Sequence, residues 1–328
     1  MKANYTTAVA LMLLAGIAVA GAKPGKPAPD AGEPPLDVVL VKGELPGPAL
    51  WKVSSGDHVL WIMGEVGAIP KHMKWRSKQF ERLLKESQEM IVDDSERAPA
   101  FTTQREAARL WKAYKLPRGQ TLQEYVSPGM YARAEAIKET FDIPVDLESE
   151  RPLAAAGQLY NLAFYRLDLM DFRARETATK LARKAKVRVT MLEFKPTFAE
   201  HLVYVESSPG DVCFSRVVEI LGDGGFGVRR LANAWSIGDI DQLRNLVPAH
   251  ELTSEHWSPN EFTSCLRGGP HRAREYFEQR TTAWLRESDR VLRDHHSTIA
   301  VMPIGWLLAP DGYLALMRAR GYEVVEPE

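Results

Sequence analysis

Three carboxylate residues lie at or just beyond the ends of β-rich runs, and they are Glu65, Asp93 and Glu193. Carboxylate oxygens are the ligands that hard cations prefer, so one hypothesis is a Mg²⁺ or Ca²⁺ site. The alternative is that these groups are surface carboxylates or ion-pair partners of Arg280. The residue types alone leave both interpretations open.

Eight histidines are present, and of these His201 and His250 have no partner at a spacing typical of metal ligands, while His58 opens a strand and His72 lies in a loop. The positions considered are His58, His72, His201, His250, His295 and His296. His295 and His296 are adjacent, so their side chains should face different directions on a helix or a strand. We therefore expect solvated or locally bonded histidines. Neither of the 2 cysteines has a nearby histidine that could activate a catalytic thiol.

The composition excludes several classes of protein. Lys and Arg total 42 and Asp and Glu total 43, so the formal charge is 42 − 43 = −1, and nothing suggests a nucleic-acid partner. The chain is 45% hydrophobic and 26% charged over 328 residues, which is typical of a globular protein rather than a disordered one. Two cysteines exclude a disulfide-dense small module.

The N-terminal region has the features of a secretory signal peptide. Lys2 precedes an apolar run from Ala8 to Ala20 that ends in small residues. Such a run is too short to span a bilayer comfortably and predicts cleavage after Ala20 or Ala22. We expect an exported protein, periplasmic or secreted, with no transmembrane helix in the mature chain.

A proline-rich segment separates this signal peptide from the folded part of the chain. We assign residues 1–22 to the signal peptide, 23–48 to a proline-rich tether and 49–328 to a single domain. Within that domain, β-rich runs flank the turn residues Ser54–Asp57 and predict a hairpin.

Strands alternate with longer helical blocks along the rest of the chain. Further strands are expected at 89–93, 187–192, 297–308 and 322–325, and helices at 75–88, 103–114, in blocks from 121 to 185, and at 311–320. This order predicts an α/β fold, a central β-sheet flanked by helices with a large helical insertion.

Two other patterns have an ordinary structural interpretation. The basic stretch from Arg173 to Arg188 contains acidic residues, which favours a solvated helix face over a site for an anionic partner. The glycine-rich segment Gly222–Gly227 follows a helical run, and no Lys-Ser/Thr pair closes it. It therefore predicts a turn rather than a phosphate-binding loop.

Several short motifs resemble, in order, those of the TraB/GumN family, which includes the Tiki metalloproteases and has a core similar to EreA/ChaN-like hydrolases. The segments that carry the resemblance are Pro48–Val53, His58–Gly64, Leu116–Leu122, Pro152 with Ala155, Ala156 and Leu159, Leu192–Glu193, Ala234–Asp239, Arg280 with Trp284, and Asp311–Tyr322. The resemblance spans about Ala49 to Val325 and implies a mixed central sheet.

The metalloprotease members of this family place metal-ligating histidines in two Gly-x-x-His motifs at strand ends, with a glutamate at another strand end. The first motif falls on Gly64 and Gly67, so glycine stands in place of histidine. The second falls on Pro303 and Trp306, and the glutamate position falls on Asp93. Glycine and indole offer no metal ligand, so the resemblance implies the scaffold without its metal site.

The leading hypothesis is therefore an exported, catalytically degenerate member that needs no cofactor. It would bind a peptide, a glycan or another envelope protein in the former cleft, and Trp61, Arg280 and Trp306 are the candidates for lining that cleft. The alternative is an active metal-dependent hydrolase, peptidase-like, that uses Glu65, Asp93 and Glu193 with Mn²⁺, Co²⁺ or Mg²⁺. A purely structural envelope component is a third possibility.

The resemblance also bears on the two cysteines. Family members often carry cysteines on either side of the segment that matches Ala234–Asp239, as Cys213 and Cys265 do here. This implies a disulfide that closes a loop of about fifty residues and contributes ~4 kcal/mol in the chain-entropy estimate.

Overall fold

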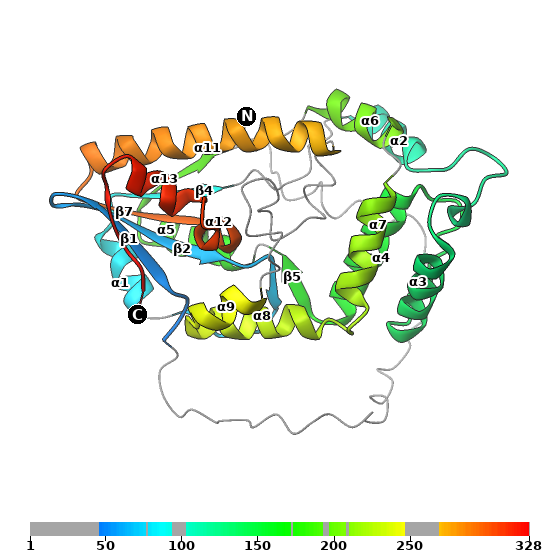
Figure 1. The fold of residues 1–328 in the computed structure, drawn as a ribbon, viewed down its shortest axis with the longest axis horizontal. Coiled ribbons are helices and arrows are strands. Elements are labelled where there is room, and N and C mark those ends of the chain that lie inside the picture. Colours follow the sequence, from blue (N-terminus) through cyan, green and yellow to red (C-terminus); the bar gives the residue numbers. More distant parts are fainter. Residues whose placement is uncertain are drawn as a thin grey trace, which may run out of the picture. The chain divides into compact units, whose positions relative to one another are not determined.

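A computed structural model describes residues 46–327, and Figure 1 shows its ribbon. The residues outside the description are 1–45, 77, 94–102, 172, 193–196, 208–209, 247–268 and 328, together with the side chains of 269–277. The described residues belong to one compact unit, Glu44–Glu328. Among them, no helix is both long and apolar enough to cross a membrane.

The fold begins with the predicted hairpin. Strand β1 (Leu50–Ser55) pairs antiparallel with β2 (His58–Glu65), and Ser55 lies opposite His58. Gly56 occupies the first central position of the two-residue turn with φ of +60°, a conformation that glycine adopts without steric strain. This turn places Asp57 and His58 side by side at one edge of the sheet.

A six-stranded sheet forms the centre of the molecule, with strand order β6-β4-β7-β2-β1-β8. The remaining strands are β4 (Glu89–Asp93), β6 (Arg188–Leu192), β7 (Ser297–Pro303) and β8 (Glu323–Val325). The pairs β6–β4, β4–β7 and β7–β2 are parallel, and β1 runs antiparallel to both of its neighbours. The four parallel strands therefore end at one common edge of the sheet.

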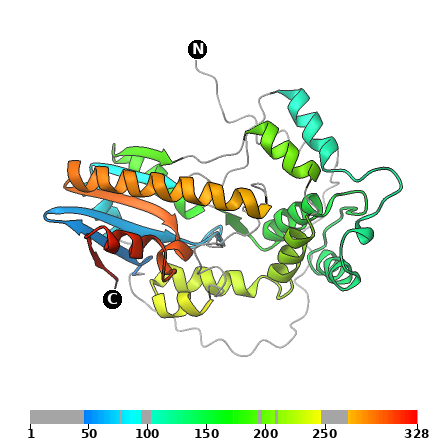
Figure 2. The ribbon, with the colours of Figure 1, turned by 45° about the horizontal axis from the view of Figure 1, so that its top comes forward.

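In the described part of the chain, several helices pack on this sheet. They include α1 (Lys78–Glu86), α5 (Arg173–Lys184), α11 (Gly269–Asp294), α12 (Ile304–Leu308) and α13 (Tyr313–Ala319). The long helix α11 runs along the sheet in Figures 1 and 2 and contacts β2 and β7. Helices α1 and α5 contact each other, and α5 packs on β4 and β6. A single apolar cluster, which includes Phe80, Met90 and Trp284, fills the space between helices and strands.

The helical insertion has apolar clusters of its own. Its elements are α2 (Gln104–Ala113), η2 (Leu122–Glu124), α3 (Pro128–Thr140), α4 (Pro152–Arg166), α6 (Phe198–Ser207), α7 (Asp211–Leu221), α8 (Phe226–Ile237) and α9 (Ile240–Leu246). Buried side chains of α4 and α7, among them Leu159 and Phe214, form the centre of a second cluster. A small two-stranded sheet, β3 (Ala68–Pro70) with β5 (Leu169–Asp171), also contributes to it. The buried side chains of α8 and α9, such as Trp235 and Leu243, belong instead to the cluster around the six-stranded sheet.

The predicted fold class, an α/β sheet with flanking helices and a helical insertion, is confirmed. Two details differ from expectation. Residues 297–308 do not form one strand, because β7 ends at Pro303 and α12 follows immediately. Proline lacks the N–H that a continuing ladder needs, and its φ of −56° suits the start of a helix. The short strands β3 and β5 were not anticipated, because three residues are too few to show a period of two.

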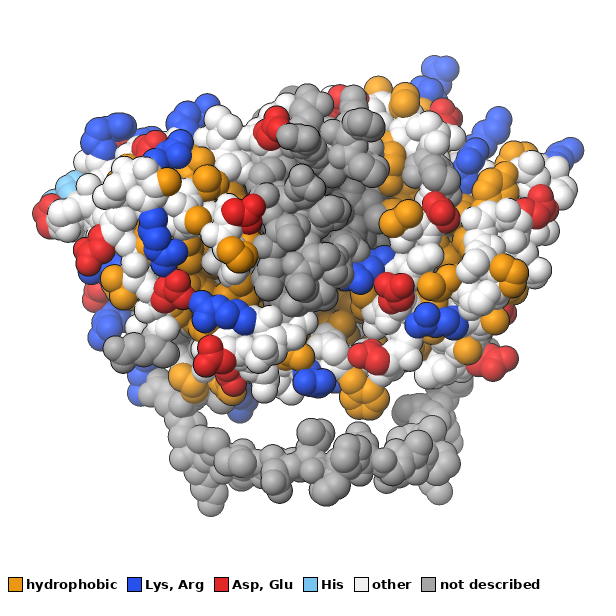
Figure 3. Space-filling view, viewed as in Figure 1, with side chains coloured by type: hydrophobic (Ala, Val, Ile, Leu, Met, Phe, Trp, Pro, Cys, Tyr) orange, Lys and Arg blue, Asp and Glu red, His pale blue; other side chains and the backbone are white. Residues whose placement is uncertain are grey.

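Charged side chains of both signs are interspersed on the surface. In the space-filling view of Figure 3, Lys and Arg alternate with Asp and Glu over the coloured part of that face. The pattern agrees with the formal charge of −1 for the whole chain.

Candidate functional site

The strand ends that carry the candidate residues meet at one edge of the sheet. In the parallel ladder between β2 and β7, Glu65 lies opposite Pro303. Strand β4 is the other neighbour of β7 and ends at Asp93. Ligand sites of parallel α/β sheets lie at the carboxyl ends of the strands, so this edge is the natural location for a site.

Asp93 is completely buried and is held by helix α11. Its Oδ2 accepts hydrogen bonds from Arg280 Nε and, at 2.9 Å, from Trp284 Nε1. Residues four apart lie on the same face of a helix, so one turn of α11 supplies both donors. Arg280 is itself only 2% exposed, so this is a buried, charge-assisted pair.

Glu65 has a different arginine partner, which comes from α5. Arg175 Nε lies 2.9 Å from Glu65 Oε1, and the two side chains are only 5% and 4% exposed. Arg175 also donates from Nη1 to the backbone oxygen of Asp93, and so it links the ends of β2 and β4. The expectation that all the basic residues from Arg173 to Arg188 form a solvated face is therefore wrong for Arg175.

The reason for this error is a matter of helix geometry. On α5, Arg175 shares its buried face with Ala174, Ala178 and Ala182, small residues that let the helix approach the sheet closely. Because arginine is polar, hydrophobic periodicity predicts that Arg175 lies on the solvent-exposed face of the helix. The available signal was the run of alanines at helical spacing around it, which marks the buried face.

Trp306 belongs to a buried aromatic cluster rather than to an open wall. Its ring centroid lies 6.3 Å from Trp284 and 5.1 Å from Tyr313, and all three residues have no measurable exposure. Ser288 Oγ lies 2.6 Å from the Tyr313 hydroxyl and donates to the backbone oxygen of Trp284 at 2.7 Å. The indole therefore fills volume at the position where the resemblance expects a histidine.

The glycine that begins the first motif, Gly64, is closely packed. A Cβ on Gly64 would lie 2.2 Å from Ile304 Cδ1, and the Gly64 carbonyl accepts a hydrogen bond of 2.6 Å from Trp235 Nε1. Glycine at this position lets α12 pack directly against β2. Gly67, two residues beyond the end of β2, is half-buried.

Some expected residues are not brought to this edge or lie beyond the description. Glu193 and Cys265 are outside the described residues, so their positions stay predictions. Cys213 is buried in a small cluster with Tyr204, whose hydroxyl lies 3.9 Å from its sulfur. Trp61 lies in the middle of β2 and is half-buried against the main core, so it is separate from the strand ends.

The described ligand candidates at this edge of the sheet, Glu65 and Asp93, do not fit a divalent cation. Glu65 and Asp93 each carry a guanidinium partner, so each buried pair has no net charge. A cation would have to approach Arg175 and Arg280 at close range in a poorly solvated region, where like charges repel strongly. The imidazole ligands implied by the resemblance are replaced by Gly67 and Trp306. The geometry is that of a structural ion-pair network.

Comparison with known proteins places the chain in a family. The family model for the TraB/PrgY/gumN family matches residues 49–326, nearly the whole chain beyond the proline-rich segment. Searches of curated proteins and of solved structures found no match in either set. Because one family model spans both the sheet and the helical insertion, the chain belongs to the TraB/PrgY/gumN family.

Proposed function

We propose that this protein is an exported, catalytically degenerate member of its family that acts as a binding or accessory protein of the cell envelope. The observation that carries this proposal is the pairing of Asp93 with Arg280 and of Glu65 with Arg175 at the strand ends. By the family resemblance, Asp93 falls on the position of the strand-end glutamate of the metalloprotease members, and Glu65 is a further carboxylate of the alternative, carboxylate-based site. Here they hold helices α5 and α11 on the sheet.

Charge pairing explains why this arrangement disfavours catalysis. A carboxylate that assists water must exchange protons or coordinate an ion, and both actions require an accessible oxygen. Asp93 Oδ2 already accepts from Arg280 and Trp284 in the buried interior. Withdrawing it would leave the Arg280 charge buried without its partner, which costs several kcal/mol, on the order of 3–5.

The ligand of such a protein would be a peptide, a glycan or another envelope protein. Arg280 and Trp306 are buried, so neither side chain is exposed to line a ligand cleft. Trp61 is only half-buried. Export is supported by the apolar run near the N-terminus, which has the length and flanks of a cleaved signal peptide.

The competing function is a metal-dependent hydrolase with a carboxylate site. To separate the two, the purified protein is analysed for bound metal and assayed for peptide and ester cleavage with added Mn²⁺, Co²⁺ or Mg²⁺. We expect no stoichiometric metal at the strand ends and no cation-dependent turnover. Turnover that a folded Asp93→Asn variant has lost would overturn the degenerate-site proposal, and turnover that survives in the folded variant would show that this carboxylate is not its source.

Binding and export have separate tests. Panels of peptides and cell-wall glycan fragments are screened for a concentration-dependent rise in Tm, because a ligand that binds only the folded state stabilises it. If no probe raises Tm and no turnover is found, the purely structural role is favoured.

For export, mass spectrometry of the periplasmic or secreted protein should find a mature N-terminus at Gly21 or Lys23. An intact Met1 in that fraction would contradict cleavage.

A further inference from the structure

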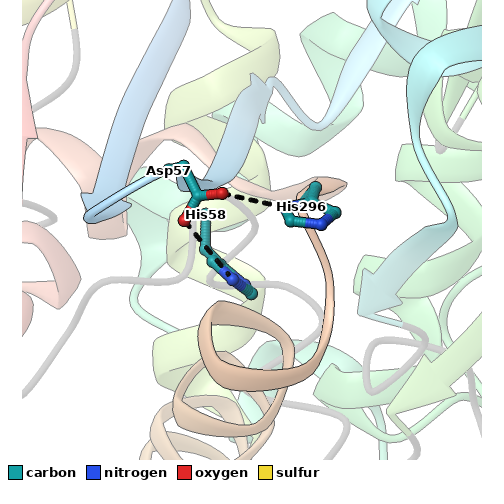
Figure 4. Close-up of side chains that lie close together, drawn as sticks. All are labelled: Asp57, His58 and His296. Atoms are coloured by element: carbon teal, nitrogen blue, oxygen red, sulfur yellow. Dashed lines mark ion pairs between the residues drawn. The ribbon is translucent and has the colours of Figure 1, made fainter.

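Two histidines and one aspartate meet at the edge of the sheet opposite to the carboxylates described above. Asp57, in the β1–β2 turn, lies between the imidazoles of His58 and His296 (Figure 4). Its two carboxylate oxygens lie 3.6 Å from His58 Nε2 and 3.2 Å from His296 Nδ1. One ligand atom from each residue lies within 4.8 Å of the others.

From this geometry we propose that Asp57, His58 and His296 form an open binding site for a zinc-class divalent cation. Two imidazoles and one carboxylate are the ligand set that Zn²⁺, Cu²⁺ or Ni²⁺ prefers over Mg²⁺ or Ca²⁺. In a tetrahedral site with bonds of 2.0–2.1 Å, neighbouring ligand atoms lie about 3.3 Å apart. Asp57 places a different oxygen near each imidazole, Oδ1 3.6 Å from His58 Nε2 and Oδ2 3.2 Å from His296 Nδ1, and one ligand atom from each residue lies within 4.8 Å of the others. Small rotations of the exposed Asp57 and His296 side chains would bring the three ligand atoms to the tetrahedral spacing.

The backbone around His296 holds this residue in place. The His296 carbonyl accepts a hydrogen bond of 2.9 Å from Val59 N, and its own N–H donates to Gln88 Oε1 at 2.7 Å. Val59 lies opposite Ser297 in the parallel ladder, so His58 and His296 occupy matching positions at the start of β2 and β7. The two rings lie side by side, with centroids 4.9 Å apart.

The side chains leave room for an ion on their outer side. Asp57 and His296 are 79% and 74% exposed, whereas His58 is 23% exposed. His58 Nδ1 is buried without a hydrogen-bond partner in the described part of the chain, so Nε2 is the nitrogen that faces Asp57. Three protein ligands leave a fourth coordination position for water, as in open zinc sites.

Neighbouring ionisable groups do not compete for these ligands. His295 points away, with Nδ1 3.2 Å from Thr298 Oγ1 and 3.5 Å from Glu89. Glu89 is buried and also pairs with Arg290. The cluster is also far from the carboxyl ends of the strands, because the eight residues of β2 span about 23 Å at 3.3 Å per step. This site is therefore separate from the proposed function, and each can fail alone.

The test is zinc binding by the purified, chelator-treated protein without a histidine tag. Isothermal titration with Zn²⁺ and elemental analysis after dialysis are carried out on the wild type and on His296→Ala. Asp57→Asn is a second variant in the exposed turn, and it keeps the test valid if His296→Ala does not fold. The matched control is His72→Ala, because His72 is an exposed histidine outside the cluster.

The wild type and His72→Ala should each bind one Zn²⁺ with the same affinity. His296→Ala and Asp57→Asn should bind it at least tenfold more weakly. Zinc should also raise Tm in the wild type and not in His296→Ala, since the ion connects the hairpin turn to the start of β7. Histidines outside the described side chains contribute equally to every variant and cancel in the comparison. Identical zinc isotherms for the wild type and both cluster variants, or no saturable binding by the wild type, would overturn the proposal.

Discussion

At the scale of single residues, two buried arginines determine what the strand-end carboxylates can do. Arg175 and Arg280 come from helices on different segments of the chain, and each neutralises one carboxylate. Buried ion pairs stabilise a fold weakly compared with apolar packing, but breaking one leaves an uncompensated charge. These residues therefore matter more through the cost of their loss than through any net gain in stability.

Removing the guanidinium of Arg175 should reveal that cost. We expect Arg175→Met to lower the free energy of unfolding by about 3–5 kcal/mol, because Glu65 stays buried without this partner. The double variant with Glu65→Leu should recover part of the loss, since neither charge is then buried. Urea denaturation followed by circular dichroism measures both values.

A surface ion pair provides the control for this prediction. Asp142 is 92% exposed and pairs with Arg166 at 3.2 Å. Asp142→Asn should change stability by less than about 1 kcal/mol, because exposed pairs are screened by solvent. If Arg175→Met lowers the free energy of unfolding by no more than Asp142→Asn does, the buried pair is no more important to stability than an exposed one.

A larger residue at Gly64 should destabilise the fold moderately, because the side chains of Ile304 and Leu307 must shift to make room for it. In Gly64→Ala the new methyl group would collide with Ile304 Cδ1, and overpacking of this kind costs about 1–3 kcal/mol. The matched control is Gly129→Ala on α3, where a Cβ meets nothing within 4 Å and alanine favours the helix by up to about 1 kcal/mol. Thermal unfolding should therefore shift in opposite directions, and equal shifts would contradict the close packing of α12 on β2.

At the scale of elements, local sequence predicts a helix well when its own ends specify it. Thr103 is the N-cap of α2, and it exchanges hydrogen bonds with Glu106 in a capping box. Strand β4 was expected over 89–93 and has those bounds, because it is short, apolar and bounded by polar residues. The boundary between β7 and α12 was missed because an apolar run does not distinguish a buried strand from a buried helix.

The packing of α2 on α6 predicts a loss of stability at alkaline pH. Burial raises the pKa of the Tyr114 phenol to about 12, and its hydroxyl lies 3.1 Å from His201 Nε2. A raised pKa means that the folded state favours the neutral phenol. This stabilisation is complete below pH 10 and is lost as the pH rises toward 12.

Tyr114→Phe tests this expectation, because phenylalanine has no proton to lose. The slope of unfolding free energy against pH between 10 and 12 should be shallower in Tyr114→Phe than in the wild type. Tyr165→Phe is the control, since Tyr165 is 78% exposed and should leave the slope unchanged. An unchanged slope in Tyr114→Phe would show that burial of this phenol does not drive the alkaline transition.

At the scale of the whole molecule, the proposed disulfide would join Cys213 of α7 to Cys265, which precedes α11 in the sequence. Titration of free thiols in the unreduced, denatured protein should find almost none if Cys213 and Cys265 are bonded. Reduction should then lower stability by ~4 kcal/mol, because the loop of about fifty residues no longer constrains the unfolded chain. Two reactive thiols per chain would contradict the pairing that the family resemblance implies.

The sequence by itself determined the secondary elements with strong local signals and the family, and its resemblance to that family predicts that Gly67 and Trp306 stand in place of two histidines. These properties depend on residues close together in the chain or on motifs in a fixed order. Only the tertiary structure decided that Arg175 meets Glu65 and that His296 meets His58. Such partners are distant in sequence, and sheet register and helix rotation bring them together, so no local pattern records which of many charged residues will meet.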